Sequence, residues 1–423
     1  MRPCDELVLE IFATTDEWFN LDVDLLDDPL AILAPEGDTN YAGFFVLDQS
    51  ELDGTDLLEG FFDAPDNGRW VDFTSTTMDI EINRGLDMRQ SVVAVPRAGI
   101  MDAVVQDPYF DALRNQNVGP KAPIRLRMGA TPVFVGEVIS LRTEYTADDI
   151  PIVFISAADA VGILNSTMID VRGAETFQER VSAIMQETGL LGSVSGTGTD
   201  MAETDKPYTA LELLQLTLNA EAGIAWVGRD NTLTALTAED SIPIDSAYYP
   251  GTPPAAMWLF SNDHSIYGHH CLTGLASGED TAQVVNNITY RNMEPETDPD
   301  TGEVTYKTVD YVEVEPTSSG YYGVGNLRLD VAVDPLTIGD RANHVFTYFS
   351  EPRKRVQNIE YVTDEFNDSS QPDIVQIDVG DPVQTYIQHP KYADDTYLDT
   401  TQRVMAISHL ISPERWTTQL SLY

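Results

Sequence analysis

The stretch "AISHLISPERWTTQLSLY", residues 406–423, alternates apolar and polar side chains on both sides of a turn. Apolar residues at every second position indicate a strand with one buried face. Proline interrupts the alternation at Pro413, so the stretch predicts two antiparallel strands joined by a tight turn. His409 lies between Ile407 and Ile411 on the apolar face, so we interpret it as structural rather than catalytic. We expect the last strand to complete a β-barrel. The apolar face of this return strand consists of Trp416, Thr418, Leu420 and Leu422.

Residues 69–156 show the same alternation and predict an all-β barrel or sandwich. Met78, Ile80 and Ile82 alternate with polar residues up to Gly85, which is typical of a half-buried strand. This unit is further expected to contain a short helix over Pro108–Arg114, inward-facing Ile124, Leu126 and Met128, and a turn at Gly129–Ala130 that pairs Val133–Leu141 with the preceding strand.

Residues 157–239 change to a helical period and predict a small α/β domain with two helices. Phe177, Val181 and Ile184 lie on one face of the first helix, and Gly189 is suited to end it. The second helix and the hairpin after it are indicated by a capping box at Thr209 and Glu212, an apolar stripe at Leu211, Leu214 and Leu218, a stop at Gly223, and a turn around Arg229–Asn231.

The remaining segments complete a mainly β fold of the α+β class. It has several domains: two β-barrel or sandwich domains and an inserted small α/β module of two helices. Residues 338–349 carry the one helix expected in the second β domain. The predicted domains are an acidic N-terminal β extension (1–68), a first β-barrel domain (69–156), the α/β domain (157–239), a loop-rich connector with one strand near 257–260 (240–283), and a second β-rich domain (284–423).

The composition is strongly acidic. Asp and Glu number 69 against 24 Lys and Arg, which gives a formal net charge of −45. Binding to nucleic acid or to anionic membranes needs clustered basic residues, so both classes of function are disfavoured. Solubility or adaptation to high salt would explain the charge, and so would an acidic channel through which DNA moves without adhering. Charge alone leaves these explanations open.

The cysteines and the apolar runs bear on the compartment. Cys4 and Cys271 are the two cysteines, and their separation leaves open whether they form a disulfide. The start "MRPCDELVLEIF" has no apolar core typical of a signal peptide. No apolar run approaches the roughly 18 residues that a membrane span needs. We expect a soluble protein made in a cytoplasm.

Potential metal ligands are densest in "HSIYGHHC", which contains His264, His269, His270 and Cys271. No second Cys/His pair completes a set of four zinc ligands, so these residues are interpreted as part of a loop. No metal site is predicted there.

Two other segments resemble ligand-binding loops only in part. Asp298, Asp300 and Gly302 lie as at the start of a calcium loop, but the glutamate at its twelfth position is missing, so a β-turn is expected. Gly196–Asp200, "GTGTD", lacks the lysine and the preceding strand of a phosphate-binding loop. No catalytic or cofactor-binding residues are predicted, and the protein is not expected to be an enzyme.

The order of several stretches resembles the minor tail proteins of long-tailed (siphovirus-like) phages and viruses, specifically their baseplate or tail-tip hub proteins. The resemblance covers roughly residues 69–423. It rests on "WVDFTSTTMDIEINRG" (70–85), "APIRLRMGATPVFVGEVISL" (122–141), "ETFQERVSAIMQETGL" (175–190), "KPYTALELLQLTLNAEAGIAWVGRDNTLTAL" (206–236), "VVNNITYRN" (284–292) and "QRVMAISHLISPERWTTQLSLY" (402–423).

This resemblance implies a homotrimer that closes the distal end of a tail tube. Two barrel domains per chain would form a pseudo-sixfold ring that matches a hexameric tube. The implied partners are the distal tail protein, the tail tube protein, the tape measure protein and a tail fibre, with DNA passing through the lumen. The implied location is the tail tip of the virion, after synthesis in the host cytoplasm.

Two other functions stay open at this stage. A distal tail ring or a receptor- or carbohydrate-binding tail protein would use exposed aromatic side chains in loops. A cell-wall hydrolase is the third and least favoured alternative. The tyrosines that support the second function are Tyr248, Tyr249, Tyr321 and Tyr322.

Overall fold

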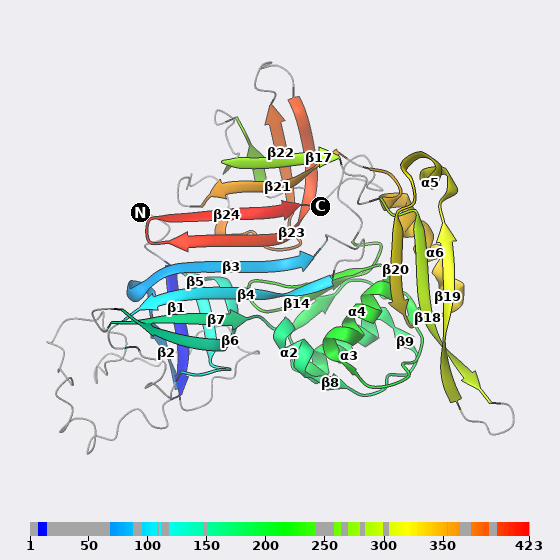
Figure 1. Ribbon diagram of the computed structural model, residues 1–423, viewed down its shortest axis with the longest axis horizontal. Helices are drawn as coiled ribbons and strands as arrows, with labels where there is room; N and C mark the ends of the chain where they lie inside the picture. The colour runs from blue at the N-terminus through cyan, green and yellow to red at the C-terminus, as the bar shows by residue number, and fades with distance from the viewer. Residues whose placement is uncertain are drawn as a thin grey trace.

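The structure is a computed structural model in which strands predominate (Figure 1). Its strands form one 14-stranded sheet and four small sheets within the part of the chain that is described. The described residues are 7–14, 68–87, 95–107, 110, 118–146, 150–241, 258–263, 270–279, 284–298, 304–352, 354–363, 374–388 and 396–422.

One half of the large sheet, the first β unit, follows the order β3-β4-β7-β6-β5-β1-β2. The sheet curls, because β2 and β3 lie at opposite ends of this order and yet are joined by the short segment around η2. This segment stays bonded to β1: Phe73 N donates to Leu9 O at 2.8 Å, and Leu9 N donates to Thr74 Oγ1 at 3.0 Å. The bounds are β1 (Leu7–Thr14), β2 (Gly68–Asp72), the 3-10 turn η2 (Thr74–Thr76), β3 (Thr77–Asp87), β4 (Val95–Gln106), β5 (Pro123–Met128), β6 (Thr131–Tyr145) and β7 (Pro151–Ala158).

The other half, the second β unit, follows the order β17-β21-β24-β23-β22-β15-β16. It curls in the same way, because β16 runs into β17 through Thr273, whose N donates to Glu360 O of β21 at 2.8 Å. The bounds are β15 (Trp258–Ser261), β16 (His270–Cys271), β17 (Gly274–Glu279), β21 (Lys354–Val362), the 3-10 turn η5 (Ile374–Gln376), β22 (Pro382–Gln388), β23 (Thr396–Ser412) and β24 (Arg415–Leu422).

Strand β23 joins the two β units. Its first half pairs with β22, and its second half pairs with β24 on one side and with β3 on the other. The crossing is close at Gly85, where φ is +124° and an added Cβ would lie 2.4 Å from Met405 O. Only glycine fits both the dihedral angle and the contact.

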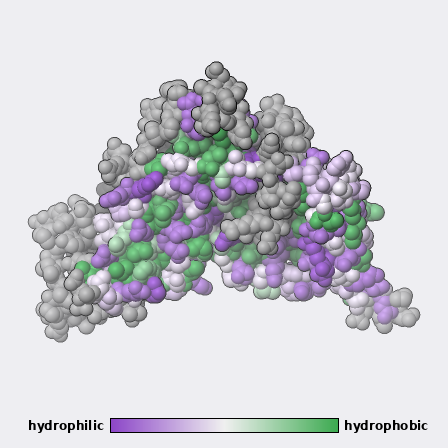
Figure 2. All heavy atoms as spheres, turned by 45° about the horizontal axis from the view of Figure 1, so that its top comes forward, coloured by the Kyte–Doolittle hydropathy of each residue, from purple (hydrophilic) through white to green (hydrophobic). Residues whose placement is uncertain are grey.

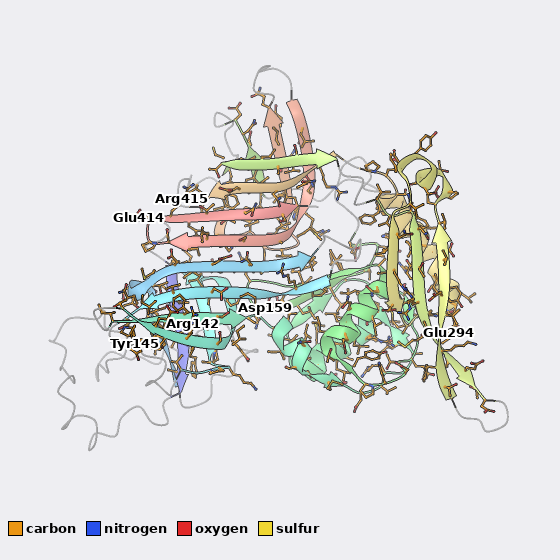
Figure 3. All side chains as sticks on the ribbon, viewed as in Figure 1. Arg142, Tyr145, Asp159, Glu294, Glu414 and Arg415 are labelled. Carbon is orange, nitrogen blue, oxygen red and sulfur yellow. The ribbon has the colours of Figure 1, made fainter. Side chains whose placement is uncertain are left out.

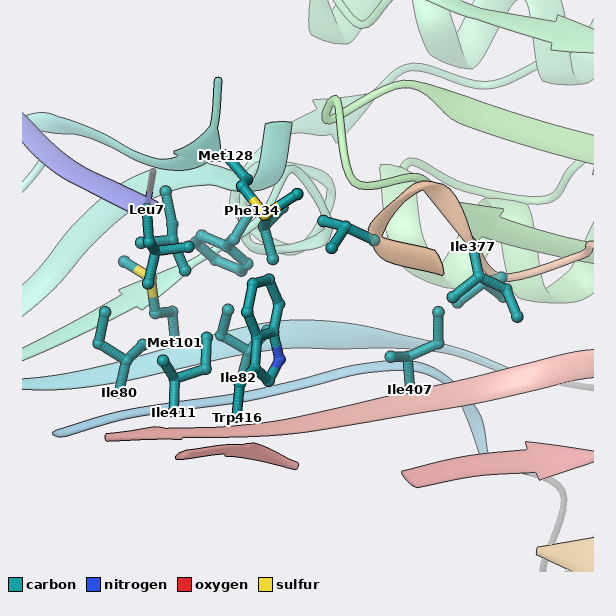
Figure 4. Close-up of a cluster of buried hydrophobic side chains, with 14 of the residues drawn as sticks. Leu7, Ile80, Ile82, Met101, Met128, Phe134, Ile377, Ile407, Ile411 and Trp416 are labelled. Carbon is teal, nitrogen blue, oxygen red and sulfur yellow. The ribbon is translucent and has the colours of Figure 1, made fainter. Parts of the chain in front are cut away.

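The two β units share one hydrophobic core, shown in Figure 4. Trp416 of β24 is fully buried and lies in the same cluster as Ile80 and Ile82 of β3. Ile407 and Ile411 of β23 complete the contact between the units. Truncating a buried Trp typically costs about 3–5 kcal/mol, so this residue contributes strongly to the sheet.

Between the two β units in sequence lies the α/β module, built around helices α3 and α4. Each begins with a capping box, Thr176 with Glu179 and Thr209 with Glu212. The bounds are α2 (Val161–Ser166), β8 (Met168–Ile169), β9 (Glu175–Thr176), α3 (Phe177–Thr188), β10 (Gly192–Val194), β11 (Asp200–Met201), β12 (Tyr208–Thr209), α4 (Ala210–Glu221), β13 (Ile224–Val227) and β14 (Leu233–Leu236).

A third sheet, in the order β19-β18-β20, packs on this module. Ile288 and Tyr290 of β18 and Val345 of helix α6 lie in one core with Leu214 of α4. In Figure 1 the sheet stands at the side of the module away from the β units. The bounds are β18 (Asn287–Thr297), β19 (Val304–Val314), α5 (Pro316–Tyr322), β20 (Asn326–Val331), the 3-10 turn η4 (Pro335–Thr337) and α6 (Ile338–Phe349).

The mainly β, multi-domain α+β fold class is confirmed, but the packing groups some elements differently from the sequence analysis. Residues 284–349 share their core with residues 157–239 rather than with the C-terminal strands. The stretch 240–283, expected to be mostly loop, supplies three strands, β15 to β17, to the second β unit. The five-part division into domains stays a prediction.

Several local expectations also need correction. Met78 is exposed, because a register irregularity between β3 and β4 at Thr77/Asp79 shifts its face. Helix α4 ends at Ala222 in the left-handed region (φ 57°), one residue before the predicted Gly223. The module has a further short helix, α2, and the helix expected over Pro108–Arg114 lies mostly outside the described residues.

The face drawn in Figure 2 mixes hydrophilic and hydrophobic side chains, and the hairpin of β18 and β19 projects from one end. Among the described helices, none has the length and apolar character required to cross a membrane.

Candidate functional site: the joint between the β units and the α/β module

A buried arginine lies where the β units meet the α/β module. Arg84 follows Ile80 and Ile82 on the inward face of β3 and is 5% exposed. Its Nη1 lies 2.5 Å from Oδ1 of Asp378, which belongs to the segment before β22. A buried charge is tolerated when it is paired and hydrogen-bonded, so this contact ties the first β unit to the second.

Asp378 also holds the turn of the β13–β14 hairpin. Its Oδ2 accepts the backbone N–H of Arg229 at 2.9 Å. Its own backbone N–H donates to Asp381 Oδ2 at 2.9 Å, and the same oxygen accepts Nε1–H of Trp258 from β15 at 3.1 Å. Asp378 therefore contacts the first β unit and the module through its carboxylate, and it links to the second unit through its backbone N–H and Asp381.

Asp159 lies at the end of β7, where the chain enters the module. Its Oδ2 accepts Gly99 N–H at 2.8 Å and its Oδ1 accepts Val161 N–H at 3.0 Å. Burial raises the pKa of Asp159 to about 7, while the two backbone hydrogen bonds and the nearby Arg84 act in the opposite direction. Figure 3 shows Asp159 between the strands and the helical module. Next to it, Ala160 N donates to Asn231 Oδ1 at 2.7 Å.

These contacts hold three parts of the chain in fixed relative positions. Arg84, Asp159 and Asp378 belong to β3, the end of β7 and the segment before β22, far apart in sequence. All are engaged with protein groups. The arrangement is suited to transmit force or fix an orientation. We call it the Arg84 joint.

The sequence analysis did not identify this joint, although part of the signal was available. Arg84 continues the inward alternation of Ile80 and Ile82, which predicts a buried cation. Asp159 and Asp378 carry no local pattern that marks them as its neighbours. Their proximity depends on the tertiary fold.

His409 is placed as predicted, on the buried face of β23. It is 3% exposed, and its Nδ1 accepts Nε1–H of Trp416 at 3.2 Å and lies 2.9 Å from Thr418 Oγ1. Burial, together with the nearby Arg84, lowers the pKa of His409 to about 3. The imidazole is neutral and acts as a hydrogen-bond acceptor inside the core.

The segment with potential metal ligands is described only in part. His270 is buried beside Phe260, with ring centroids 5.5 Å apart, and burial raises the pKa of the Cys271 thiol. His264, His269 and Cys4 lie outside the described residues. Across the described ranges, no group of three or more His, Cys, Asp or Glu is placed to hold a metal ion.

The Gly-rich loop at Gly196–Asp200 packs against the start of helix α3. The N–H groups of Phe177 and Gln178, at the first helical positions, donate to Thr199 O at 2.9 Å and Thr197 O at 3.1 Å. Thr199 N donates to Glu221 Oε2 at 2.6 Å. Protein carbonyls therefore occupy the donors that a phosphate would need.

The remaining candidates fall at the third sheet. Asp298 follows β18, whereas Asp300 and Gly302 lie outside the described residues, as do Tyr248 and Tyr249. Tyr321 and Tyr322 are on the last turn of α5 rather than in a loop, with ring centroids 6.3 Å apart. They are 82% and 43% exposed.

A groove of about 320 Å³ runs between α4 and the outward face of the third sheet. Arg291 crosses it and lies 3.2 Å from Oδ1 of Asp330, while Tyr208 O–H donates to Asp205 Oδ1 at 2.7 Å. Asn219 Nδ2 also donates to the backbone oxygen of Asp330 at 3.0 Å, so the carboxylate and the backbone of Asp330 are both engaged by protein groups. Its lining comprises Tyr208, Glu212, Gln215, Leu216, Asn219, Arg291, Met293, Thr308 and Asp330.

Comparison with known proteins shows which solved structures share this fold. No family model matches the sequence, and no curated protein sequence matches it. The chain is similar to a solved tail protein from Neisseria meningitidis MC58, with a TM-score of 0.54 and 12% identity over 84% of this chain and 93% of that one. It is also similar to the 43 kDa tail protein of prophage MuSo2 from Shewanella oneidensis, with a TM-score of 0.53 and 12% identity over 84% of this chain and 95% of that one. At such low identity the likeness shows the fold alone, which this chain shares with two tail proteins.

Proposed function

We propose that this chain is a structural component of a virus tail, and that it forms a trimeric hub at the distal end of the tail tube. The observation that carries the proposal is β23, which pairs with β22, β24 and β3 and so fixes two β units side by side in one chain. The fold likeness to two tail proteins over 84% of the chain supports the class of function.

The trimer is part of this proposal, and the paired β units support it. Three copies around one axis would present six β units, which suits a hexameric tube above them. The Arg84 joint supports this role, because a ring under load needs fixed angles between its parts. In this proposal the tail tube protein, the distal tail protein, the tape measure protein and a fibre contact the hub. The hub would be located at the tail tip of the virion.

The charge has a role in the same proposal. Three copies would carry three times −45, a formal charge of −135. Like charge along a lumen would prevent exiting DNA from adhering to the wall. A structure of the assembly that placed the acidic side chains mainly on its outside would remove this explanation.

Electron microscopy of the purified chain tests the proposed architecture. We expect class averages with threefold symmetry, six lobes and a central channel. A sixfold ring built from six chains would instead support a distal tail ring. Single particles of one chain would contradict both.

A receptor-binding tail protein is the second candidate, and it rests on the exposed pair Tyr321 and Tyr322. Aromatic faces on a surface suit stacking against sugar rings. Binding to a glycan array that is lost in Tyr321→Ala, but kept in the neighbouring Ser319→Ala, would support this candidate. We expect no turnover of peptidoglycan by the purified protein, since a non-enzymatic role fits the buried, mutually paired polar groups.

A further inference from the structure

We propose that the free edge of strand β19 accepts an extended, basic segment of another protein as an additional strand. The inference goes beyond the proposed function and does not depend on the number of subunits. It rests on the backbone direction, the exposed side chains and the charge of β19.

Strand β19 is a long edge strand whose protection against pairing is limited to the charged side chains of Lys307, Asp310 and Glu313. It pairs over 11 residues with β18 in unbroken register, and among the described strands it has no second neighbour. It contains no proline and no bulge. At about 3.4 Å per residue the edge is about 37 Å long. Natural proteins shorten, bend or cover such edges, because they recruit other strands.

The other sheet edges are protected in these ways. Strand β16 has two residues and β2 has five, and β17 has a register irregularity at Ala276/Ser277. The edge of β20 is covered by α4, whose Asn219 Nδ2 donates to the backbone oxygen of Asp330 at 3.0 Å. Strand β19 therefore has the longest edge that is unpaired from end to end among the described strands, and Figure 1 shows it as the outermost strand of its sheet.

The hydrogen-bond pattern fixes which backbone groups face outward. Glu315 N donates to Asn286 O at 2.9 Å, which makes these two residues a hydrogen-bonded pair. Such pairs alternate along an antiparallel ladder. Even-numbered residues of β19 therefore direct their N–H and C=O groups away from β18. They are Val304, Tyr306, Thr308, Asp310, Val312 and Val314.

The same even-numbered residues place apolar side chains on the exposed face of the sheet. Val312 is 58% exposed, Val304 49% and Val314 48%. The opposite face is buried, with Ile288 and Tyr290 of the paired strand in the core. An added strand would extend this face and cover the valines from the side.

Charge selects the occupant. Asp310 and Glu313 lie along β19 on opposite faces, Asp310 Oδ1 lies 3.9 Å from Nε of Arg291, and Lys307 is paired with Glu296 at 3.3 Å. A second copy of this chain, with its own net charge of −45, would meet repulsion at this edge. In a segment that alternates lysine or arginine with β-branched residues, the basic side chains would lie on the face of Glu313 and the apolar side chains on the opposite face, beside the valines.

The test uses the full chain and a short fluorescein-labelled peptide that alternates lysine with valine. We expect saturable binding in fluorescence anisotropy at low salt, and none for a peptide with glutamate in place of lysine. Val312→Pro removes one outward N–H and leaves the β18 ladder intact, so it should weaken binding about tenfold. Val312→Thr keeps the N–H and the branched side chain and should leave the affinity unchanged.

Amide hydrogen exchange separates strand addition from other modes of binding. Bound peptide should protect the even-numbered amides of β19, while the odd-numbered amides should stay protected throughout, including in Val312→Pro. If that variant loses the odd-numbered protection, Val312→Lys takes its place, because it adds a repelling charge without changing the backbone. Three results would each overturn the proposal. The first is an affinity of Val312→Pro, or of Val312→Lys in its place, equal to that of the wild type. The others are amide protection elsewhere on the chain when the peptide binds, and self-association of the chain that Val312→Pro abolishes.

Discussion

Asp159 and His409 are buried titratable residues whose pKa values are displaced in opposite directions. Burial favours the neutral form of each, so the pKa of Asp159 rises to about 7 and that of His409 falls to about 3. Arg84 lies near both and opposes ionisation only of the histidine. The two residues therefore contribute opposite pH dependences to the stability of the fold.

For Asp159 we predict a stability contribution that falls as pH rises. Between about pH 4 and 7 the folded state keeps the proton that the unfolded state has lost. The free energy of unfolding therefore falls by up to about 1.4 kcal/mol for each unit by which the pH rises. Asp159→Asn does not titrate. In urea unfolding, the difference in free energy of unfolding between the wild type and Asp159→Asn should therefore shrink from pH 5 to pH 7. A constant difference would contradict the buried neutral carboxyl, and the exposed Asp102→Asn serves as the control.

For His409 the sign is reversed. The unfolded state binds a proton below about pH 6.5 that the folded state does not take up until about pH 3, so stability rises with pH in this window. From pH 5 to 6 the free energy of unfolding of the wild type should rise, relative to that of His409→Gln, by about 1.4 kcal/mol per pH unit. Above pH 7 it should rise no further. Equal pH dependence of the two proteins would show that the imidazole is solvated or charged.

At the scale of elements, local patterns predicted the hairpins and the three 12-residue helices α3, α4 and α6 well. The β5–β6 turn at Gly129, the α3 stop at Gly189 and the β23–β24 hairpin were confirmed, because each depends on residues close together in sequence. The capping box at Thr209 was identified, whereas the equivalent Thr176 box was missed although its Thr-x-x-Glu signal is present. In the presumed connector the strand expected near 257–260 corresponds to β15, whereas β16 and β17 were missed, since short strands among glycine and proline carry little periodicity.

We predict that Thr176→Ala destabilises helix α3 by about 1 kcal/mol. The substitution removes the side-chain acceptor of Glu179 N–H, which lies 3.2 Å away, and the hydroxyl that donates to Glu179 Oε2 at 3.0 Å, while the backbone N–H of Thr176 can still donate to that carboxylate. Urea unfolding and amide exchange across residues 177–188 measure the effect. Ser182→Ala, exposed in the middle of the same helix, should be neutral or slightly stabilising, and equal stability of the two variants would contradict the capping role.

At the scale of the whole molecule, the sequence predicted the fold class but not the way in which the parts are joined. The β3–β23 ladder connects residues more than three hundred positions apart in the chain, and no local period reports such a pairing. The same holds for the Arg84 joint and for the shared core of residues 157–239 and 284–349. For β3 and β23 the alternation of apolar residues predicted a strand, whereas the strand that pairs with it is determined by the tertiary fold.

The central claim is that paired β units in each chain build a trimeric ring. Native mass spectrometry of the purified, untagged chain at physiological salt tests it most directly. The account predicts a dominant species with three times the 46.7 kDa mass of one chain. A dominant monomer, or a species of six chains, would contradict it.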